Sequence, residues 1–593
     1  MDLTDKTNTT DSLIRLRIFY AAVLVIFGIF VVRLFYLQII HHDAYIKAAR
    51  SDQIREYEVD ADRGTIYAQL GGKTVPLVLN TKLNTIYADP SLVKKPDEVA
   101  AKLAPLLGAK QSDLKDLLSL KDKRYVILKK HVSPEASKKV LALKMPGIGS
   151  QERNYRTYPQ GTLASQLLGF VNDDGVGNYG IEQALNGELA GQKGQLRAVT
   201  DVHGIPLAAN TDNLIKEPVA GTDVTLTIDL GIQTQVEQIL KRAQEKFHSK
   251  KLSAVVLETQ TGAVKAMANY PTYDPANYQT VEDGNLFQNA SVSEPIEPGS
   301  ITKVFNTAAG LDTGAITPDT TYNDPGVWTF DGAKVVNVAE GTGSGPQSIR
   351  SMLNSSLNTG AVWVLMQMGG GKINDKARQT LYDYYTNHYR LGKATGIEQG
   401  YEGIGSIVRP EDKDNGITIT YANMSFGQAY SATALQMGSA LSAIVNGGTY
   451  YQPHLVASTK SGSGVVKNTA PNVLRTGVVS QKTSDEMVSL LDYVTKQHVK
   501  TWPYMGFSDQ YVVGGKTGTA QMVNDNGAGY RDDVFNGTFM GFVGGDKPQY
   551  TIVVYNIQPR GYAGYAGANT GQPLFAEIAH MLIDNYGVTP KSK

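Results

Sequence analysis

Three short motifs restrict the possible folds of this chain more than any other feature. In chain order they are Ser300-Ile301-Thr302-Lys303, Ser356-Leu357-Asn358 and Lys516-Thr517-Gly518-Thr519. A serine, two lysines, a second serine and an asparagine in this order are the side chains of a serine acyl-transfer site. The motifs are separated by domain-scale distances, so we expect one large domain to bring them together.

Sequence context separates the first motif from chance matches. The S-x-x-K pattern also occurs at residues 91–94 and 112–115, which we interpret as surface sequence. Only Ser300 follows Glu297-Pro298-Gly299, precedes an apolar helix-like stretch and has both other motifs downstream. Each motif alone is more often structural than catalytic, whereas the ordered set predicts an active site.

The first motif suits a nucleophile and its base. On a helix, S-x-x-K places Lys303 one turn from Ser300 on the same face, where the amine can take the hydroxyl proton. The amine is a base only when neutral, a form that burial and a second cation, for which Lys516 is the candidate, both favour. Backbone N–H groups at the helix start and at Thr519 would form an oxyanion hole, worth about 3 to 4 kcal/mol per donor.

The other two motifs suit proton transfer and substrate binding. Ser356 can relay a proton towards the leaving amine, and Asn358 can hydrogen-bond a substrate amide. The third motif offers an ammonium and two hydroxyls for a substrate carboxylate, and a glycine that leaves the backbone open to an extended peptide. These four residues are Lys516, Thr517, Thr519 and Gly518.

An apolar segment near the N-terminus predicts a membrane anchor. Residues 18–32 are all apolar, and after Arg33 the apolar character continues to residue 40. A helix over residues 18–40 would be about 34 Å long, enough to cross a bilayer. Bulky residues after the apolar core argue against a cleaved signal peptide. A buried hairpin helix is the alternative, and basic residues on both sides leave the orientation open.

Composition narrows the classes of function. The 56 basic and 56 acidic residues cancel, so a nucleic-acid partner is not expected. The absence of cysteine excludes disulfides, thiolate nucleophiles and cysteine-ligated zinc. The nine histidines show no ligand spacing, and we therefore expect no metal and no cofactor.

The 593 residues exceed one compact core, so an α+β multidomain chain is expected. We predict a cytoplasmic tail at 1–17, the transmembrane helix at 18–40, an elongated α+β pedestal domain at 41–217 and a catalytic domain at 218–588. In the catalytic domain we expect an antiparallel five-stranded sheet flanked by helices, and a helical lobe over 301–448 that carries Ser300. The sheet strands are expected at residues 253–259, 263–269, 511–522, 537–543 and 550–557.

These residues resemble the class B penicillin-binding proteins, which are monofunctional peptidoglycan D,D-transpeptidases. The resemblance covers nearly the whole chain. Outside the three motifs it is carried by residues 63–67, 156–161, 169–171, 180–182, 261–268, 515–521 and 539–542. Two positions depart from the family pattern: Gln166 stands where histidine is common, and residues 77–80 follow the pattern only loosely.

The resemblance implies a reaction. Ser300 would attack the penultimate D-Ala carbonyl of a stem peptide ending in D-Ala-D-Ala, expel the terminal D-Ala and pass the acyl group to an amine of a neighbouring stem. It also implies acylation of Ser300 by β-lactams and a catalytic domain outside the cell membrane. The implied catalytic residues are Ser300, Lys303, Ser356, Asn358 and Lys516, and the implied substrate-binding residues are Thr517, Gly518 and Thr519.

Residues 424–428, with Thr433 and Gln436, look more like the division-type subgroup, which makes septal wall. The sequence before the catalytic domain shows no glycosyltransferase-like pattern. The resemblance therefore implies as partners a membrane glycan polymerase of the shape, elongation, division and sporulation family and other divisome proteins. An elongation-type transpeptidase, a hydrolytic β-lactamase or carboxypeptidase, and a non-catalytic β-lactam-binding scaffold or sensor remain open. The acceptor amine and the oligomeric state are not predicted.

Overall fold

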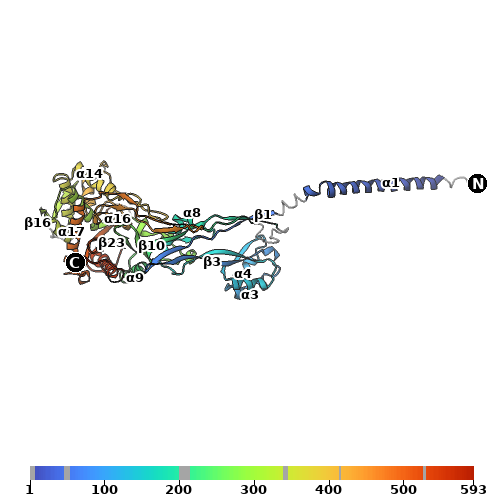
Figure 1. Ribbon diagram of the computed structural model, residues 1–593, viewed down its shortest axis with the longest axis horizontal. Coiled ribbons are helices and arrows are strands. Elements are labelled where there is room, and N and C mark those ends of the chain that lie inside the picture. The colour runs from blue at the N-terminus through green and yellow to red at the C-terminus, as the bar shows by residue number, and fades with distance from the viewer. Residues whose placement is uncertain are drawn as a thin grey trace, which may run out of the picture. The chain divides into compact units, whose positions relative to one another are not determined.

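The computed structural model of the protein describes residues 7–45, 54–199, 214–337, 345–412, 416–524 and 529–592 (Figure 1). The chain forms two compact units. One consists of Met1–Ala61 and Gln192–Val219, and the other of Asp62–Gly191 and Ala220–Lys593. Residues 1–6 of the predicted cytoplasmic tail lie outside the described residues.

The first unit contains the N-terminal helix and a small sheet. Helix α1 (Thr7–Phe35) continues into the π-helical turn η1 (Tyr36–Ile40). The stretch Leu13–Ile40 is long and apolar enough to cross a membrane, and none of its apolar window is buried among the described residues, in agreement with the anchor predicted at 18–40. Strand β8 (Gly194–Val199) pairs with both β1 (Ile54–Val59) and β9 (Leu214–Lys216) in an antiparallel sheet.

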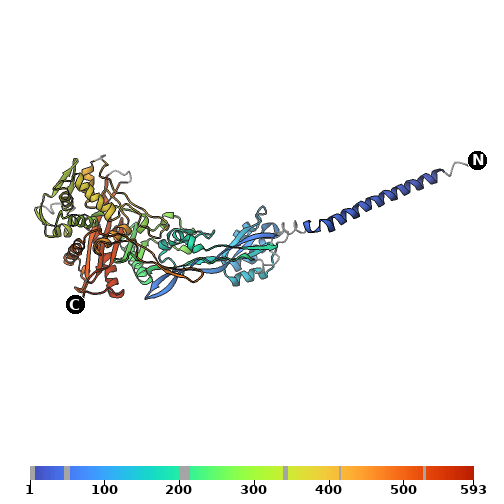
Figure 2. The ribbon, with the colours of Figure 1, turned by 45° about the horizontal axis from the view of Figure 1, so that its top comes forward.

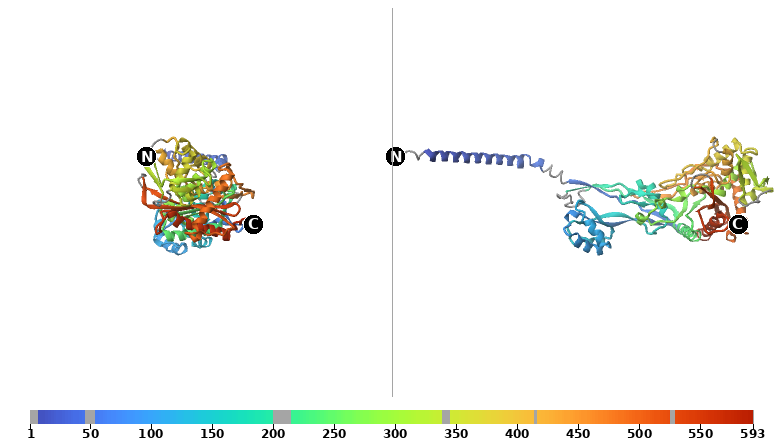
Figure 3. Two further views of the ribbon diagram at one scale, coloured as in Figure 1. Left: turned by 90° about the vertical axis from the view of Figure 1, so that its left-hand side faces the viewer. Right: turned by 180° about the vertical axis from the view of Figure 1, so that it is seen from behind.

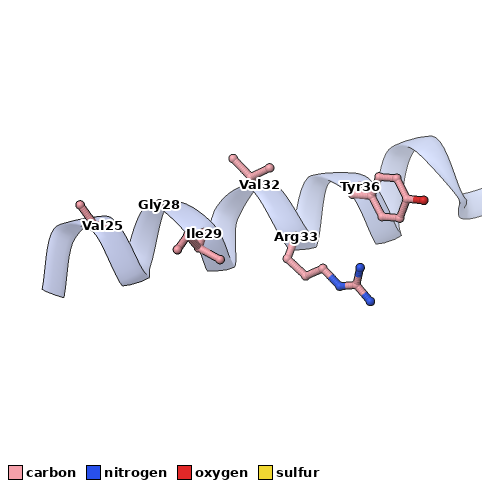
Figure 4. Close-up of a pocket in the computed structure, with 6 residues that line it drawn as sticks. All are labelled: Val25, Gly28, Ile29, Val32, Arg33 and Tyr36. Carbon is pink, nitrogen blue, oxygen red and sulfur yellow. The ribbon is translucent and has the colours of Figure 1, made fainter. Parts of the chain in front are cut away.

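One side of α1 is hollowed at Gly28 (Figure 4). Glycine leaves open space at this point, since no atom lies within 4 Å of the position that a Cβ would take. The hollow is bordered by apolar side chains and closed at one end by a cation and an aromatic ring. These residues are Val25, Ile29, Val32, Arg33 and Tyr36.

A seven-stranded sheet runs through the second unit (Figure 2). Its centre is the parallel pairing of β10 (Asp223–Asp229) with β2 (Ile66–Leu70), which joins sequence on both sides of residue 218. Residues Ile66 and Leu226 from these strands lie in the same hydrophobic core as the helical lobe. The other strands are β3 (Lys73–Ala88), β4 (Val126–Val132), β5 (Ile148–Thr157), β18 (Val456–Lys460) and β19 (Val466–Asn468).

Three helices pack on the β3–β4–β5 end of this sheet around a core of their own, which includes Ile86, Leu103 and Val140. They are α3 (Pro96–Leu107), α4 (Gln111–Leu118) and α5 (Pro134–Ala142). The rest of the segment 62–191 is short elements: η2 (Pro90–Leu92), α6 (Ser165–Leu168), β6 (Phe170–Val171), β7 (Gly177–Asn178), α7 (Gly180–Ala184) and α8 (Asn186–Ala190).

The predicted five-stranded antiparallel sheet is confirmed (Figure 3). In spatial order its strands are β12 (Val264–Tyr270), β11 (Lys251–Glu258), β23 (Pro548–Ile557), β22 (Tyr530–Gly544) and β21 (Val512–Val523). Strand β22 begins seven residues before the predicted residue 537, because its pairing with β21 continues to Val523 and Tyr530.

Side chains alternate between the two faces of this sheet, as the period of a strand requires. Ala254 and Val256 pack with α9 (Leu230–Phe247) and α18 (Gln572–Asn585). Val255 and Leu257 belong instead to the core of the helical lobe. Helices therefore cover both faces of the sheet.

The predicted helical lobe is also confirmed, with one addition. It contains α11 (Lys303–Asp312), α12 (Ile349–Asn354), α13 (Asn358–Met368), α14 (Asp375–Asp383), η7 (Tyr384–His388), α15 (Ile417–Met424) and α16 (Ala434–Val445). The addition is two small strand pairs, β13 (Thr321–Asp324) with β16 (Gly345–Ser348) and β14 (Val327–Phe330) with β15 (Ala333–Val336). Helix α17 (Gln481–His498) then leads towards β21.

Short elements complete the second unit. They are η4 (Pro275–Thr280), η5 (Gly284–Phe287), α10 (Ala290–Ser293), η6 (Gly299–Thr302), β17 (Tyr450–Tyr451), β20 (Val473–Arg475), η8 (Pro503–Met505) and η9 (Gly567–Gly571).

Candidate active site

Ser300 lies in η6, a 3₁₀ turn that leads directly into α11. The turn is held against β21 by its glycine: Gly299 has φ 67°, and a Cβ there would come within 2.8 Å of the Thr519 carbonyl oxygen. The Gly299 N–H also donates to the carbonyl of Gly427 over 3.0 Å. Only glycine combines this backbone conformation with this close approach.

The amine of Lys303 is where the first two motifs meet. Lys303 is fully buried, and its Nζ lies 2.9 Å from Ser300 Oγ. The same nitrogen lies 2.6 Å from the Ser356 carbonyl oxygen, 3.1 Å from Ser356 Oγ and 2.8 Å from Asn358 Oδ1. The structure thus places three of the other predicted site residues, Ser300, Ser356 and Asn358, around the nitrogen of Lys303.

These partners suit a neutral amine. The carbonyl of Ser356 and Oδ1 of Asn358 can only accept, so they take the two N–H groups of a neutral Lys303. The lone pair is then left for the hydroxyl proton of Ser300. Burial, as the larger cause, and the positive charge of Lys516, as the smaller, hold the pKa of Lys303 well below its usual value. The site therefore favours the form of Lys303 that can act as a base.

Ser356 adopts an unusual backbone conformation, with φ 56° in the left-handed region. Such a conformation costs a non-glycine residue about 1 to 3 kcal/mol and is concentrated at functional sites. Here it accompanies the approach of both Ser356 oxygens to Lys303 Nζ. The strained residue thus coincides with the second motif.

Lys516 is also fully buried, on β21. Its Nζ donates to the carbonyl and to Oγ1 of Thr517, both at 3.1 Å, and no ion pair with a carboxylate occurs within the described parts of the chain. Burial lowers the pKa of Lys516 to about 7. An anionic ligand beside this amine would favour its protonated form, so Lys516 could bind such a ligand.

The structure adds a reason for Gly518 that sequence reasoning missed. A Cβ there would lie 2.1 Å from Thr538 Oγ1 and 2.7 Å from the Pro298 carbonyl oxygen. The missing side chain therefore lets β21 pack against the turn that carries Ser300. Beside it, Thr519 Oγ1 accepts the N–H of Gly567 at 3.0 Å.

A cleft of about 380 Å³ opens over these groups. Ser300, Ser356, Thr517 and Thr519 line it, whereas Lys303 and Lys516 are buried beside it. Most of the other lining residues belong to no motif and carried no signal in the sequence. They are Asn337, Gln347, Asn354, Ser355, Leu357, Gln497, His498, Thr501, Trp502, Tyr565 and Ala568.

His498, at the end of α17, is the titratable residue that sequence reasoning missed. Its Nδ1 lies 3.0 Å from Gln572 Oε1, and its ring packs edge-on against Trp502. Burial, and next the charge of Lys516, lower the pKa of His498 to about 4. His498 is therefore neutral near pH 7. Among the described residues, no group of histidine, cysteine, aspartate or glutamate side chains could hold a metal ion.

Comparisons with known proteins agree with this geometry. The model of the penicillin-binding protein transpeptidase domain matches residues 252–580, which include all three motifs. The model of the penicillin-binding protein dimerisation domain matches residues 58–226.

Individual relatives match nearly the whole chain. Stage V sporulation protein D of Bacillus subtilis is 29% identical over 575 residues, which cover 96% of this chain and 85% of that protein. Peptidoglycan D,D-transpeptidase FtsI of Buchnera aphidicola is 26% identical, covering 97% and 96%. The crystal structure of penicillin-binding protein 3 from Mycobacterium tuberculosis, complexed with aztreonam, superposes with a TM-score of 0.67 at 26% identity, covering 90% of this chain and 98% of that one.

Proposed function

Since the chain belongs to the penicillin-binding protein transpeptidase family, we propose that it cross-links peptidoglycan stem peptides through an acyl-enzyme on Ser300. It is a serine-type D,D-transpeptidase of the class B penicillin-binding proteins. The observation that carries the assignment of Ser300 is the buried Lys303 amine, 2.9 Å from Ser300 Oγ and bound to two groups that can only accept. The scissile bond is the amide between the last two residues of a stem peptide ending in D-Ala-D-Ala.

Acylation proceeds by proton transfer and attack. Lys303 takes the hydroxyl proton as Ser300 Oγ attacks the carbonyl carbon of the penultimate D-Ala. The developing oxyanion is stabilised by the backbone N–H groups of Ser300 and Thr519. The C–N bond then breaks, the proton passes from Lys303 by way of Ser356 to the leaving amine, and D-Ala departs. The peptide remains as an ester of Ser300.

Transfer reverses these roles. The amine of a neighbouring stem peptide attacks the ester carbonyl and gives up a proton to the Lys303 and Ser356 pair. The C–O bond breaks, Ser300 Oγ regains a proton, and the new amide joins the two stems. Reaction with water instead would give a carboxypeptidase, so the fate of the ester separates the proposed function from hydrolysis.

We assign substrate binding to the third motif. The buried amine of Lys516, which has no carboxylate partner among the described residues, and the hydroxyls of Thr517 and Thr519 suit the terminal carboxylate of the stem peptide. A β-lactam carries a carboxylate beside a reactive amide, so we propose that it binds here and acylates Ser300. Within the part of the chain that the structure describes, Asn358 Nδ2 donates only to the Val336 carbonyl, so its second N–H can bind a substrate carbonyl.

The chain layout follows from this chemistry. We propose a cytoplasmic tail at 1–17, a single transmembrane helix at 18–40, a pedestal at 41–217 and the catalytic domain at 218–588, with the last two outside the membrane, where stem peptides are cross-linked. We propose a division-type role beside a membrane glycan polymerase of the shape, elongation, division and sporulation family. The hollow at Gly28 on α1 (Figure 4) suits close packing with a transmembrane helix of that partner.

The test compares full-length wild type, Ser300→Ala and Ser112→Ala in detergent with fluorescent penicillin. Ser112 is the matched control, because it begins a second S-x-x-K sequence, on α4. We expect a covalent adduct in wild type and Ser112→Ala, and none in Ser300→Ala. An adduct that persists in Ser300→Ala would remove Ser300 as the nucleophile. Folded wild type that forms no adduct would contradict the proposed acyl-enzyme and favour a scaffold whose catalytic motifs have lost their activity.

A second measurement addresses the reaction and the pathway. With stem pentapeptides and an acceptor amine, we expect cross-linked dimers and released D-Ala from wild type. Hydrolysed tetrapeptide alone would indicate a carboxypeptidase. Depletion in cells should give filaments, whereas rounded cells would indicate the elongation-type role.

A further inference from the structure

The side-chain amide of Asn358 has an orientation that its two neighbours determine. Its Oδ1 accepts from Lys303 Nζ at 2.8 Å, and its Nδ2 donates to the Val336 carbonyl, at the end of β15, at 3.0 Å. A carbonyl can only accept, so the N–H end of the amide must face Val336. Lys303 therefore meets an acceptor and not a second donor.

The next residue, Thr359, is bound by the same region of the chain through all three of its polar groups. Thr359 is fully buried in the first turn of α13, where backbone N–H groups have no partner within the helix. Its N–H donates to Asn337 Oδ1 at 3.1 Å, and its carbonyl accepts from Trp328 Nε1 at 3.0 Å. Its hydroxyl donates to Asp324 Oδ2 at 2.6 Å.

Asp324 ends β13 and is only 2% exposed. Its carboxylate accepts from the Thr359 hydroxyl, from the Gly326 N–H at 2.7 Å and more weakly from the Tyr322 hydroxyl at 3.4 Å. No ion pair of Asp324 occurs in the part of the chain that the structure describes. A buried carboxylate held by neutral donors makes short, strong hydrogen bonds to them, so its contact with Thr359 is firm.

We propose that Asp324 and Thr359 are positioning residues, which hold Asn358 and through it set the direction of the Lys303 lone pair. The inference rests on the proposed function of Ser300 and Lys303. Without the contact from Thr359 to Asp324, the first turn of α13 shifts and Asn358 Oδ1 leaves Lys303. An N–H of Lys303 then turns to Ser300 Oγ, where it donates and cannot accept the hydroxyl proton.

The test is the Thr359→Val variant of the full-length protein, which keeps the side-chain shape and removes the hydroxyl. The rate constant of acylation at saturating fluorescent penicillin should fall at least about tenfold, while the apparent dissociation constant changes less than about twofold. Thr359→Ser should recover most of the rate. Thr495→Val is the matched control, because the buried Thr495 hydroxyl on α17 has no hydrogen-bond partner among the described residues. The rate of this variant should equal that of wild type.

A double-mutant cycle with Asn358→Ala separates positioning from general stability. If Thr359 acts through Asn358, Thr359→Val should cost less than about twofold in the Asn358→Ala background. An equal loss in both backgrounds, or no loss in wild type, would overturn the proposal. Should Thr359→Val not fold, Asp324→Asn replaces it in the same cycle. Wild type that is not acylated would instead contradict the proposed function itself.

Discussion

Glu182, in the segment 62–191, is fully buried, and so are Lys303 and Lys516 of the candidate active site. Among the described residues, Glu182 alone of these three lies against side chains of opposite charge. Its Oε2 accepts from Arg63 Nε at 2.7 Å and its Oε1 from Arg156 Nε at 2.9 Å. In the parts of the chain that the structure describes, Lys303 and Lys516 form hydrogen bonds only with hydroxyl, carbonyl and amide oxygens. The same molecule thus buries charge in two ways.

The difference separates a structural site from a reactive one. Both arginines of the Glu182 cluster make further hydrogen bonds, Arg63 to Asn186 and Arg156 to Asn80 and the Gly64 carbonyl. Paired groups of this kind hold distant segments of the chain together. Lys303 and Lys516, which pair with no carboxylate among the described residues, have lowered pKa values instead. For Lys303 this agrees with its proposed role as a base, and for Lys516 a bound anion would favour the protonated form.

The largest expected effect is that of Lys303→Met on the reaction. Removing a general base costs roughly 10²- to 10⁴-fold, so acylation by fluorescent penicillin should fall by that factor. Stopped-flow or quench measurements at pH 7 would show it. A variant within threefold of wild type would contradict the assignment of Lys303.

The same variant tests how burial acts on Lys303. An unfolded chain protonates this lysine below a pKa of about 10.4, whereas the fold keeps it neutral to a much lower pH, so the buried amine destabilises the fold at pH 7. Lys303→Met should therefore raise the melting temperature at pH 7, and the gain should shrink as the pH rises towards 10. A lower melting temperature of Lys303→Met at both pH values would show that the interactions of Lys303 outweigh the cost of burying its amine.

Glu182→Gln should have the opposite profile. Removing one partner of a buried ion pair costs about 3 to 5 kcal/mol, because the two arginines lose their counter-charge. We expect a markedly lower melting temperature with an unchanged acylation rate per folded molecule. Glu188→Gln is the control, since Glu188 is exposed on the neighbouring helix α8. A loss of rate at full stability would place Glu182 in the reaction.

Lys516→Met should shift the pH dependence of acylation. The positive charge of Lys516 helps to lower the pKa of Lys303, so its removal raises that pKa. The neutral base then forms only at higher pH, and the rise of the acylation rate constant with pH moves in the same direction. Affinity for penicillin should fall about tenfold or more with the lost carboxylate contact. An unmoved profile would show that the two lysines do not interact.

The smallest expected effect concerns Glu237 on α9, whose surroundings are intermediate between those of the ion-paired Glu182 and those of Lys303 and Lys516. Its Oε1 accepts from the Ala164 N–H at 2.7 Å and from Gln233 Nε2 at 2.8 Å, and burial raises its pKa to about 7. Between about pH 4.5 and 7 the folded protein keeps this carboxyl protonated, whereas the unfolded chain has released the proton. The free energy of unfolding therefore falls as the pH rises through this window.

The Glu237→Gln side chain does not titrate, so this variant should be more stable than wild type at pH 8, by on the order of 3 kcal/mol. The two proteins should have the same stability near pH 4. Melting curves at the two pH values measure the difference. A Glu237→Gln variant that is less stable than wild type at pH 8 would show that the surrounding groups stabilise the Glu237 carboxylate, as the two arginines stabilise Glu182.

Local patterns predicted much of this molecule. The passage from strand β10 to helix α9 has such a local signal, because the Asp229 side chain between them caps the helix by accepting from the Gly231 and Ile232 N–H groups. The five strands of the central sheet and the three motifs were visible for the same reason. Strand alternation, helix caps and S-x-x-K spacing all lie within a few consecutive residues.

The features that the sequence did not predict depend on contacts between residues that are distant along the chain. The pairing of β10 with β2, the packing of Gly518 against Pro298 and the presence of His498 in the cleft have no local signature. The same holds for the contact of Asp324 with Thr359. Residue type and spacing specify which chemistry a chain carries. Burial and hydrogen-bond partners, which exist only once remote segments pack, set the charge and direction of each group.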